Sequence, residues 1–400
     1  PRTVPAAGTV ARPGGARELP TTEEADDEAL DMPALPVAAA GGDGPAMAPW
    51  QNAERLFFAG RYEEALAAYR SLRAAVPLGR SRAGICLAKL GRWEEAVGEL
   101  EAAVAALPND FSSRLWLANA LYRGNDLPAA LEQVRAALAL QRDVTLLEME
   151  SRLERELRVQ QRYDGARTEN FIVLFDGYEH EEIRGAVLDV LKEARAAIGK
   201  ELDHYPAERV TVILYTSRDF TDVTRAPEWS GGLYGKFDGK IRLPVQGATG
   251  REGTLRRVLF HEYTHALIYS LAPDCPLWLH EGLAQYLSGG RGVSVGQVIP
   301  LESLGDGFPS EERAAYVAYM ESLQAVSDLI AERGMPPMRR LLNGLGEGMG
   351  LEAAFAAAYG RPFSRWAQQW RPVERGEPGG EETEEGEDDQ AGQEGDQEGV

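Results

Sequence analysis

Two histidines, His261 and His265, stand four residues apart, with Glu262 directly after the first. On a helix, residues i and i+4 project from one face a turn apart, which suits two ligands of one tetrahedral Zn²⁺. Glu262 is rotated by about 100° from His261, so it cannot easily join them but can reach a water on the metal. The pattern predicts a metal site that carries out hydrolysis.

The segment around these residues predicts a buried helix. From Thr254 to Ala272 apolar residues fall on nearly every face, as in helices that lie inside a protein. Burying two imidazoles and a carboxylate costs several kcal/mol unless each finds a partner. The alternative, a surface helix with incidental histidines, is disfavoured by the apolar residues.

The next helix supplies a third ligand. His265 lies seven residues before the first helix ends, or about 10 Å, and Glu281 lies five residues into the helix that starts at Pro276, or about 7.5 Å. An antiparallel pair therefore brings Glu281 level with His265, and Gly282 and Ala284 allow the two helices to close up. Two His and one carboxylate leave a fourth position for water, the pattern of a catalytic zinc. We expect one Zn²⁺ per chain.

The two motifs FHEYTHALI and PLWLHEGLAQYL resemble those of the gluzincin metallopeptidases, most closely the peptidase MA-like group. The resemblance covers about residues 165–372. It implies a zincin-like domain, peptidase activity, His261, His265 and Glu281 as zinc ligands, and Glu262 as catalytic base. Gln285 stands where thermolysin-type enzymes have an Asp, and the aminopeptidase signature Gly-Ala-Met-Glu-Asn is absent from the sequence, so aminopeptidase activity is not implied.

Two further residues near the motifs have open roles. Related enzymes often place an oxyanion-donating Tyr on a later helix, which nominates Tyr319, with Tyr316 as its rival and a core or surface tyrosine as the alternative. His280 points away from Glu281 on its helix. It contacts the substrate or a ligand, or else makes an ordinary polar contact, the alternative that we favour.

The elements ahead of the motifs predict a small mixed sheet. Residues 171–175 and 210–215 are β-branched runs separated by a helical stretch over about 180–202. A Gly-rich hairpin follows and ends in a strand over 240–245, where Pro244 indicates a sheet edge. We expect an extended peptide to add to that strand. Strands followed by helices to about Trp370 indicate an α+β fold.

Residues 49–142 repeat themselves. Ala65, Ala96 and Ala130 recur at spacings of 31 and 34 residues within three similar segments, and Gly124 stands one place early in the third. The pattern resembles the tetratricopeptide repeat (TPR) family and implies an all-α solenoid. A capping helix over about 144–160 completes it. A TPR groove implies a protein partner.

Composition bounds the remaining classes. The net charge of −21 argues against nucleic acid or an anionic membrane as partner, and no apolar run reaches the roughly 18 residues of a membrane span. We read 1–48 as a disordered head, 49–162 as repeats, 163–372 as the peptidase domain and 373–400 as a disordered acidic tail. A first residue other than Met fits a secreted, trimmed chain, so we expect a periplasmic or extracellular location, with the cytoplasm as the alternative.

The sequence thus predicts a zinc metallopeptidase whose repeats recruit a partner or its peptide or protein substrate. The alternative is a TPR scaffold with a catalytically silent zincin-like domain. The intact set of His261, Glu262, His265 and Glu281 favours the enzyme, since a scaffold can lose Glu262 without harming a metal site.

Overall fold

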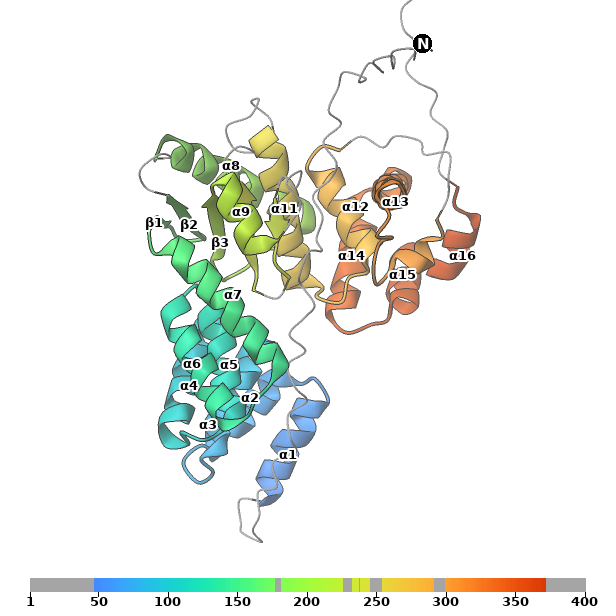
Figure 1. The fold of residues 1–400 in the computed structure, drawn as a ribbon. Coiled ribbons are helices and arrows are strands. Elements are labelled where there is room, and N and C mark those ends of the chain that lie inside the picture. The colour runs from blue at the N-terminus through green and yellow to red at the C-terminus, as the bar shows by residue number, and fades with distance from the viewer. Residues whose placement is uncertain are drawn as a thin grey trace, which may run out of the picture.

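The computed structural model describes residues 47–176, 181–225, 232–236, 238–244, 254–290 and 299–371. The head predicted at 1–48, except for its last two residues, and the acidic tail predicted at 373–400 lie outside these ranges. Within them, a helical repeat array packs below a mixed sheet in the view of Figure 1. Further helices cover the sheet, and the last helices of the chain lie beside them.

The array consists of helices stacked in antiparallel pairs. Its members are α1 (Met47–Phe58), α2 (Tyr62–Leu72), α3 (Leu78–Lys89), α4 (Trp93–Ala106), α5 (Phe111–Arg123), α6 (Leu127–Leu140) and the capping helix α7 (Val144–Gln160). The recurring Ala65, Ala96 and Ala130 are fully buried, one in each second helix. A small residue at this position lets neighbouring helices approach closely. The predicted solenoid is confirmed.

The turns inside the repeats explain why the third unit tolerates a glycine one place early. Gly60 and Gly91 take φ of +74° and +75°, the left-handed region that favours glycine. In the third unit Asn125 takes this place with φ +61°, while Gly124 stays right-handed. Asparagine tolerates the left-handed region better than most residues, so the early glycine does not break the repeat.

The sheet is mixed, as predicted. Its strands are β1 (Tyr163–Arg167), β2 (Phe171–Asp176), β3 (Val210–Tyr215), β4 (Leu233–Tyr234) and β5 (Lys240–Pro244), in the spatial order β1-β2-β3-β5-β4. The central strands β2, β3 and β5 run parallel, and β1 and β4 pair antiparallel at the two sides. Strand β1 was not expected, because its sequence YDGAR has little apolar or β-branched character.

The prediction that the strand at 240–245 lies at the sheet edge is wrong. Strand β5 runs between β3 and β4, and among the described strands the two-residue β4 is the outer one on this side. Strand β4 pairs only with Ile241 and Arg242, so Pro244 pairs with β3 alone. A proline that cannot donate is therefore accommodated beyond the reach of β4. Val245 lies outside the described residues.

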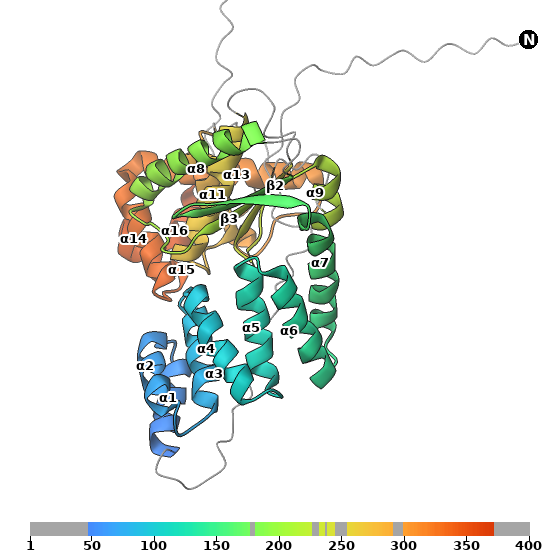
Figure 2. The ribbon, with the colours of Figure 1, turned by 90° about the vertical axis from the view of Figure 1, so that its left-hand side faces the viewer.

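The two faces of the sheet are covered differently (Figure 2). Helices α8 (Glu181–Leu202) and α11 (Thr254–Leu271) pack on one face, where Val173, Val212 and Ile241 join the main core. Helices α7 and α9 (Ser217–Thr224) and the array lie toward the other face, where Ile213 and Tyr215 form a separate apolar cluster with Phe220 and Val223. Strand β3 is therefore buried on both faces.

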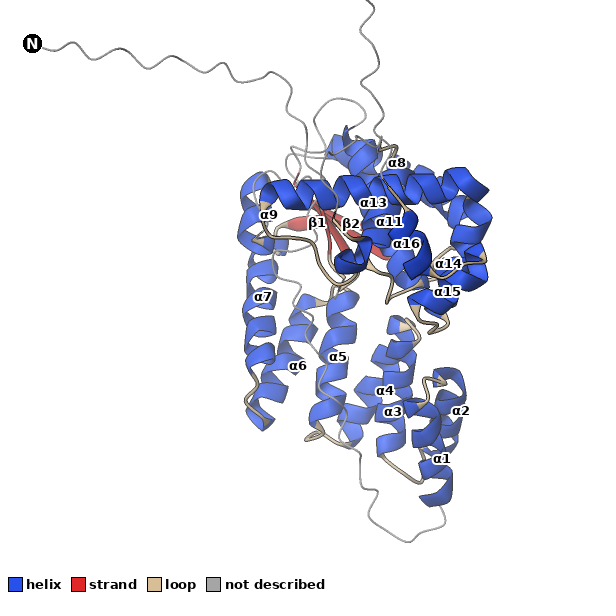
Figure 3. Ribbon diagram, turned by 90° about the vertical axis from the view of Figure 1, so that its right-hand side faces the viewer, coloured by secondary structure: helices blue, strands red, loops and turns tan. Residues whose placement is uncertain are grey.

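The remaining elements are helical, as predicted for the region up to about Trp370 (Figure 3). They are α12 (Leu277–Leu287), a 3₁₀ turn (Leu301–Leu304), α13 (Glu312–Arg333), α14 (Met335–Gly346), α15 (Leu351–Tyr359) and α16 (Phe363–Gln369). Among the helices in the described ranges, none combines the length and the apolar character that crossing a bilayer requires.

Candidate metal centre

Helix α11 is buried along its middle, as its sequence predicts. All residues from Leu259 to Ile268 are buried, and this stretch includes both histidines of the motif. His261 is 6% exposed, Glu262 1% and His265 0%. Polar side chains at such depth need specific partners, so their surroundings define what the site can do.

The second motif helix brings Glu281 to the two histidines. Ligand atoms of His261, His265 and Glu281 all lie within 4.8 Å of one another. Nε2 of His265 lies 3.0 Å from Nε2 of His261 and 3.6 Å from Oε1 of Glu281, and Nε2 of His261 lies 3.6 Å from Oε2 of Glu281. The structure therefore brings the three side chains together as the predicted ligand set requires.

This donor set fits a zinc ion. Zinc–nitrogen and zinc–oxygen bonds of about 2.0–2.1 Å in a tetrahedron place donor atoms about 3.3 Å apart. The three separations of 3.0, 3.6 and 3.6 Å bracket that value. Two imidazoles and one carboxylate are also the donors that catalytic zinc sites use.

Burial keeps the imidazoles in the form that binds metals. It lowers the pKa of His261 to about 3, an effect to which the nearby Arg257 adds and which a hydrogen bond to the backbone of Ala284 opposes. Burial also lowers the pKa of His265 well below its ordinary value, with a further lowering from His261 and His280. Both rings are therefore neutral near pH 7, with a lone pair available for a cation.

Glu262 lies under the outer strand of the sheet. A Cβ atom added to Gly232, just before β4, would come within 3.0 Å of Oε1 of Glu262. The ring of Tyr234 in β4 lies 6.4 Å from that of His265, centroid to centroid. Strand β4 thus borders both the candidate base and a candidate ligand. Sequence reasoning missed Gly232 and Tyr234, because a two-residue strand leaves almost no periodic signal.

His280 contacts the candidate ligand His265, whereas the sequence favours an ordinary polar contact for it. Nδ1 of His280 lies 2.8 Å from Nδ1 of His265, on the side of the ring away from His261 and Glu281. Burial lowers the pKa of His280 to about 3, with smaller effects from Lys236 and His261. It is thus a neutral ring whose Nδ1 can accept a hydrogen bond from His265.

Gly282 lies at the contact of α12 with α13, and not at the expected contact of α12 with α11. A Cβ atom there would lie 2.3 Å from the backbone oxygen of Ser322 and 2.6 Å from Val326, both in α13. The glycine therefore lets α12 approach α13 rather than α11. Gln285 joins the same two helices, since its Nε2 donates to the backbone oxygen of Tyr319 at 2.9 Å.

Tyr319 lies on α13, the helix that packs against α12. Its side chain is buried, and its ring meets Phe308 edge to face at 4.8 Å. The role of its hydroxyl as an oxyanion donor stays a prediction.

Two family models match the chain. Residues 193–375 match the Peptidase MA superfamily, and residues 51–111 and 82–144 match the tetratricopeptide repeat. The chain therefore carries TPR repeats followed by a Peptidase MA superfamily domain, and both resemblances are confirmed in that order. The first match begins inside α8, after β1 and β2. No curated protein is similar enough to the chain to count as a match.

Proposed function

We propose that the Peptidase MA superfamily domain hydrolyses peptide bonds with one zinc ion held by His261, His265 and Glu281. The observation that carries the proposal is the convergence of three donor atoms within 4.8 Å, next to Glu262, inside a buried helix. Bound zinc would polarise a water and the substrate carbonyl as a Lewis acid.

Side chains of the protein would transfer the protons and stabilise the developing charge. Glu262 accepts a proton from the attacking water and passes it to the departing amine. Tyr319 is the candidate donor to the carbonyl oxygen as negative charge develops there. Burial of the site strengthens each of these interactions, because little water competes.

The substrate strand would pair with β4. Strand β4 is the outer strand, and its surroundings include Glu262 and His265. A peptide that adds to this strand would lie beside Glu262 and His265, with main-chain hydrogen bonds giving affinity. This replaces the expectation that the peptide adds to β5, which is an inner strand.

The repeats would recruit a protein partner or the substrate protein, as TPR arrays offer an extended concave surface. The alternative function, a scaffold with a silent peptidase domain, keeps the same array but needs no chemistry at Glu262.

Zinc content and hydrolysis measured together test the proposal. We expect about one zinc per chain in the wild type and in Glu262→Gln, with hydrolysis of a broad peptide library lost only in the variant. Glu54→Gln, which changes a buried carboxylate in the array, serves as the control and keeps activity. Loss of zinc in Glu262→Gln would show that this residue is a ligand. A zinc-bound wild type that cleaves nothing would favour the scaffold.

A further inference from the structure

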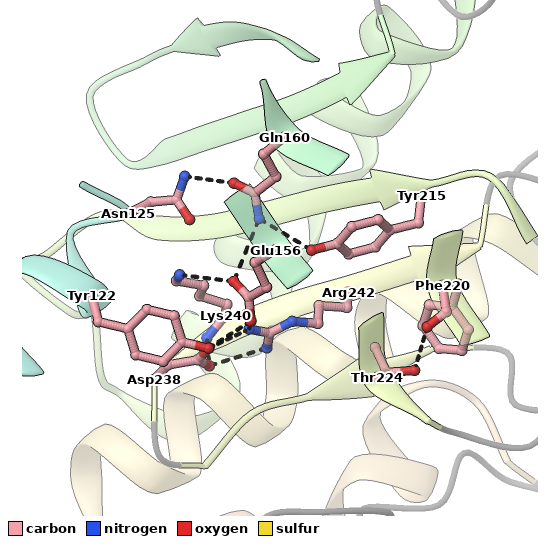
Figure 4. Close-up of polar contacts among 10 residues, drawn as sticks. All are labelled: Tyr122, Asn125, Glu156, Gln160, Tyr215, Phe220, Thr224, Asp238, Lys240 and Arg242. Carbon is pink, nitrogen blue, oxygen red and sulfur yellow. Dashed lines mark hydrogen bonds and ion pairs between the residues drawn. The ribbon is translucent and has the colours of Figure 1, made fainter. Parts of the chain in front are cut away.

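A cluster of buried charges joins the repeat array to the sheet (Figure 4). Helix α5 contributes one residue, α7 another, the β4–β5 turn a third and β5 the other two. We call this the interface cluster; its members are Tyr122, Glu156, Asp238, Lys240 and Arg242. All five side chains are buried.

Glu156 of the array is the centre of these contacts. Its Oε1 accepts hydrogen bonds from Oη of Tyr122 at 2.6 Å and from Nη2 of Arg242 at 3.0 Å. Its Oε2 lies 3.7 Å from Nζ of Lys240. The ammonium of Lys240 also lies 4.0 Å from the centre of the Tyr122 ring, a distance typical of a cation–π contact.

Asp238 extends the cluster into the hairpin turn. Arg242 donates to both oxygens of Asp238, and the backbone N–H of Lys240 donates to Oδ1 of Asp238 at 3.1 Å. A Cβ atom on Gly235 would lie 2.3 Å from that oxygen. The turn therefore closes around the ion pair, and the backbone N–H of Gly235 donates to the carbonyl of Lys240 at 2.8 Å.

The charges of the cluster balance, with two carboxylates and two cations. Burial raises the pKa of Glu156, but the opposing effects of Arg242 and Lys240 are larger together, so the pKa is lowered. Burial lowers the pKa of Lys240 to about 8, against the effect of Glu156 and Asp238. All four groups are therefore charged near pH 7, and removing one leaves its partner buried without compensation.

The same hairpin reaches the candidate metal centre at its other side. Gly232 lies next to Glu262, and Tyr234 next to His265. Beside the cluster, a cavity of about 290 Å³ lies between α4, α5 and the first three strands. At the rim of this cavity, Arg209 donates a hydrogen bond to Glu94, and the backbone N–H of Trp93 donates to Glu208. These two contacts join the array to the residues just before β3 and not to β4. The interface cluster thus ties the array to the hairpin.

We propose that Glu156 and Tyr122 are positioning residues: from the repeat array they hold the β4–β5 hairpin at the register that places the β4 edge beside the metal centre. The proposal rests on the proposed function, because β4 is there the strand that receives the peptide. The array is then part of the substrate-binding side of the peptidase, and not only a recruiting arm.

The chain offers a matched control for each change. Within the first repeats, Oη of Tyr69 donates to Glu54 at 2.6 Å, and Nε of Arg82 donates to the same carboxylate at 2.9 Å. This buried triad repeats the chemistry of Tyr122, Glu156 and Arg242 but lies wholly inside the array. Glu54→Gln and Tyr69→Phe are therefore the controls for Glu156→Gln and Tyr122→Phe.

Hydrogen exchange of the full-length protein, followed by mass spectrometry, tests the proposal without relying on activity. In Glu156→Gln we expect amides of residues 233–236 and 238–243 to exchange at least about tenfold faster, because an uncompensated buried charge promotes local opening. Tyr122→Phe keeps the charges and gives a smaller increase in the same peptides, which covers the case that Glu156→Gln does not fold. The two controls leave exchange of the same hairpin amides within about twofold of wild type.

Peptide kinetics and zinc binding separate positioning from general damage. We expect KM of Glu156→Gln to rise about tenfold with a smaller change in kcat, since substrate pairing with β4 is what weakens. The zinc dissociation constant stays within about twofold of wild type. Unchanged hairpin exchange in both interface variants, or an equal increase in the controls, would overturn the proposal. A wild type that hydrolyses no peptide would defeat the proposed function, and exchange alone would then decide the inference.

Discussion

Nδ1 of His265 and Nδ1 of His280 lie 2.8 Å apart, in rings inclined by only 10°. This separation is shorter than the contact of two stacked rings and lies within hydrogen-bond range, so the two imidazoles meet edge to edge in a hydrogen bond. If Nε2 of His265 binds the metal, its Nδ1 carries the hydrogen and donates it to His280. Such partners fix the orientation and raise the basicity of a ligand histidine.

His280→Phe should therefore weaken zinc binding by about 10- to 100-fold, the usual cost of losing the partner of a ligand histidine. Competition with a chelator measures this directly. His204→Phe is the control, because His204 contacts Ser270 of the same helix α11 but lies outside the ligand set. Equal zinc affinity in the two variants would contradict the assigned hydrogen bond.

Gly282→Ala should lower the free energy of unfolding by about 3 kcal/mol, the upper range for overpacking a core. The added methyl group would lie 2.3 Å from the backbone oxygen of Ser322, which cannot rotate away. Gly98→Ala tests the same change in open space, since a Cβ there has no neighbour within 4 Å. In that helix, α4, alanine should add about 1 kcal/mol. Urea unfolding of both variants measures the change in the free energy of unfolding, which we expect to be a loss for Gly282→Ala and a gain for Gly98→Ala. An unchanged stability of Gly282→Ala would show that α12 and α13 can separate at no cost.

Glu321 should make stability fall as the pH rises. Burial raises its pKa to about 7, although the backbone N–H of Ile299 donates to the carboxylate and opposes the shift. The folded protein then keeps a proton that the unfolded chain releases near pH 4.5. The stabilisation from this group is complete below that pH and is lost as the pH rises through 7.

Glu321→Gln removes this titration. Between pH 4.5 and 7.5 the unfolding free energy of the wild type should fall, relative to the variant, by up to about 3 kcal/mol. Denaturant unfolding of both proteins in the presence of a chelator measures the difference without a contribution from metal. Parallel pH profiles would show that Glu321 is ionised in the fold at no cost.

Tyr319→Phe should lower kcat by about 10²–10³, the usual loss when one oxyanion donor is removed, while the zinc dissociation constant is unchanged. Tyr316→Phe is the matched comparison, one turn earlier on α13. If Tyr316→Phe carries the loss instead, the donor is the rival tyrosine. If neither variant loses activity, the oxyanion donor is neither tyrosine.

Local spacing made the candidate ligands predictable. His261 and His265 share a face because any helix places i and i+4 there, and the short link to α12 limits where Glu281 can lie. Local spacing could not predict the left-handed backbone of Asn125 or the packing of Gly282 against α13. The first depends on one residue's tolerance of a backbone conformation, and the second depends on where a distant helix packs.

The sheet shows the same limit. Strand β4 has two residues, and nothing in its sequence indicates that it covers β5, so the sequence predicts a sheet edge at Pro244. Lys240 and Arg242 alternate with apolar residues, a pattern that normally means one solvated face. That face is buried because α5 and α7 pack on it, and packing between distant segments is not encoded in the strand itself.

The balance of charges along β5 bears on how proteins of this architecture diverge. Exchanging the repeats for those of another protein would leave two cations, at 240 and 242, with a single carboxylate at 238. Positions 156, 238, 240 and 242 should accordingly be inherited as a set, and a chimera should fold well only when all four come from the same parent.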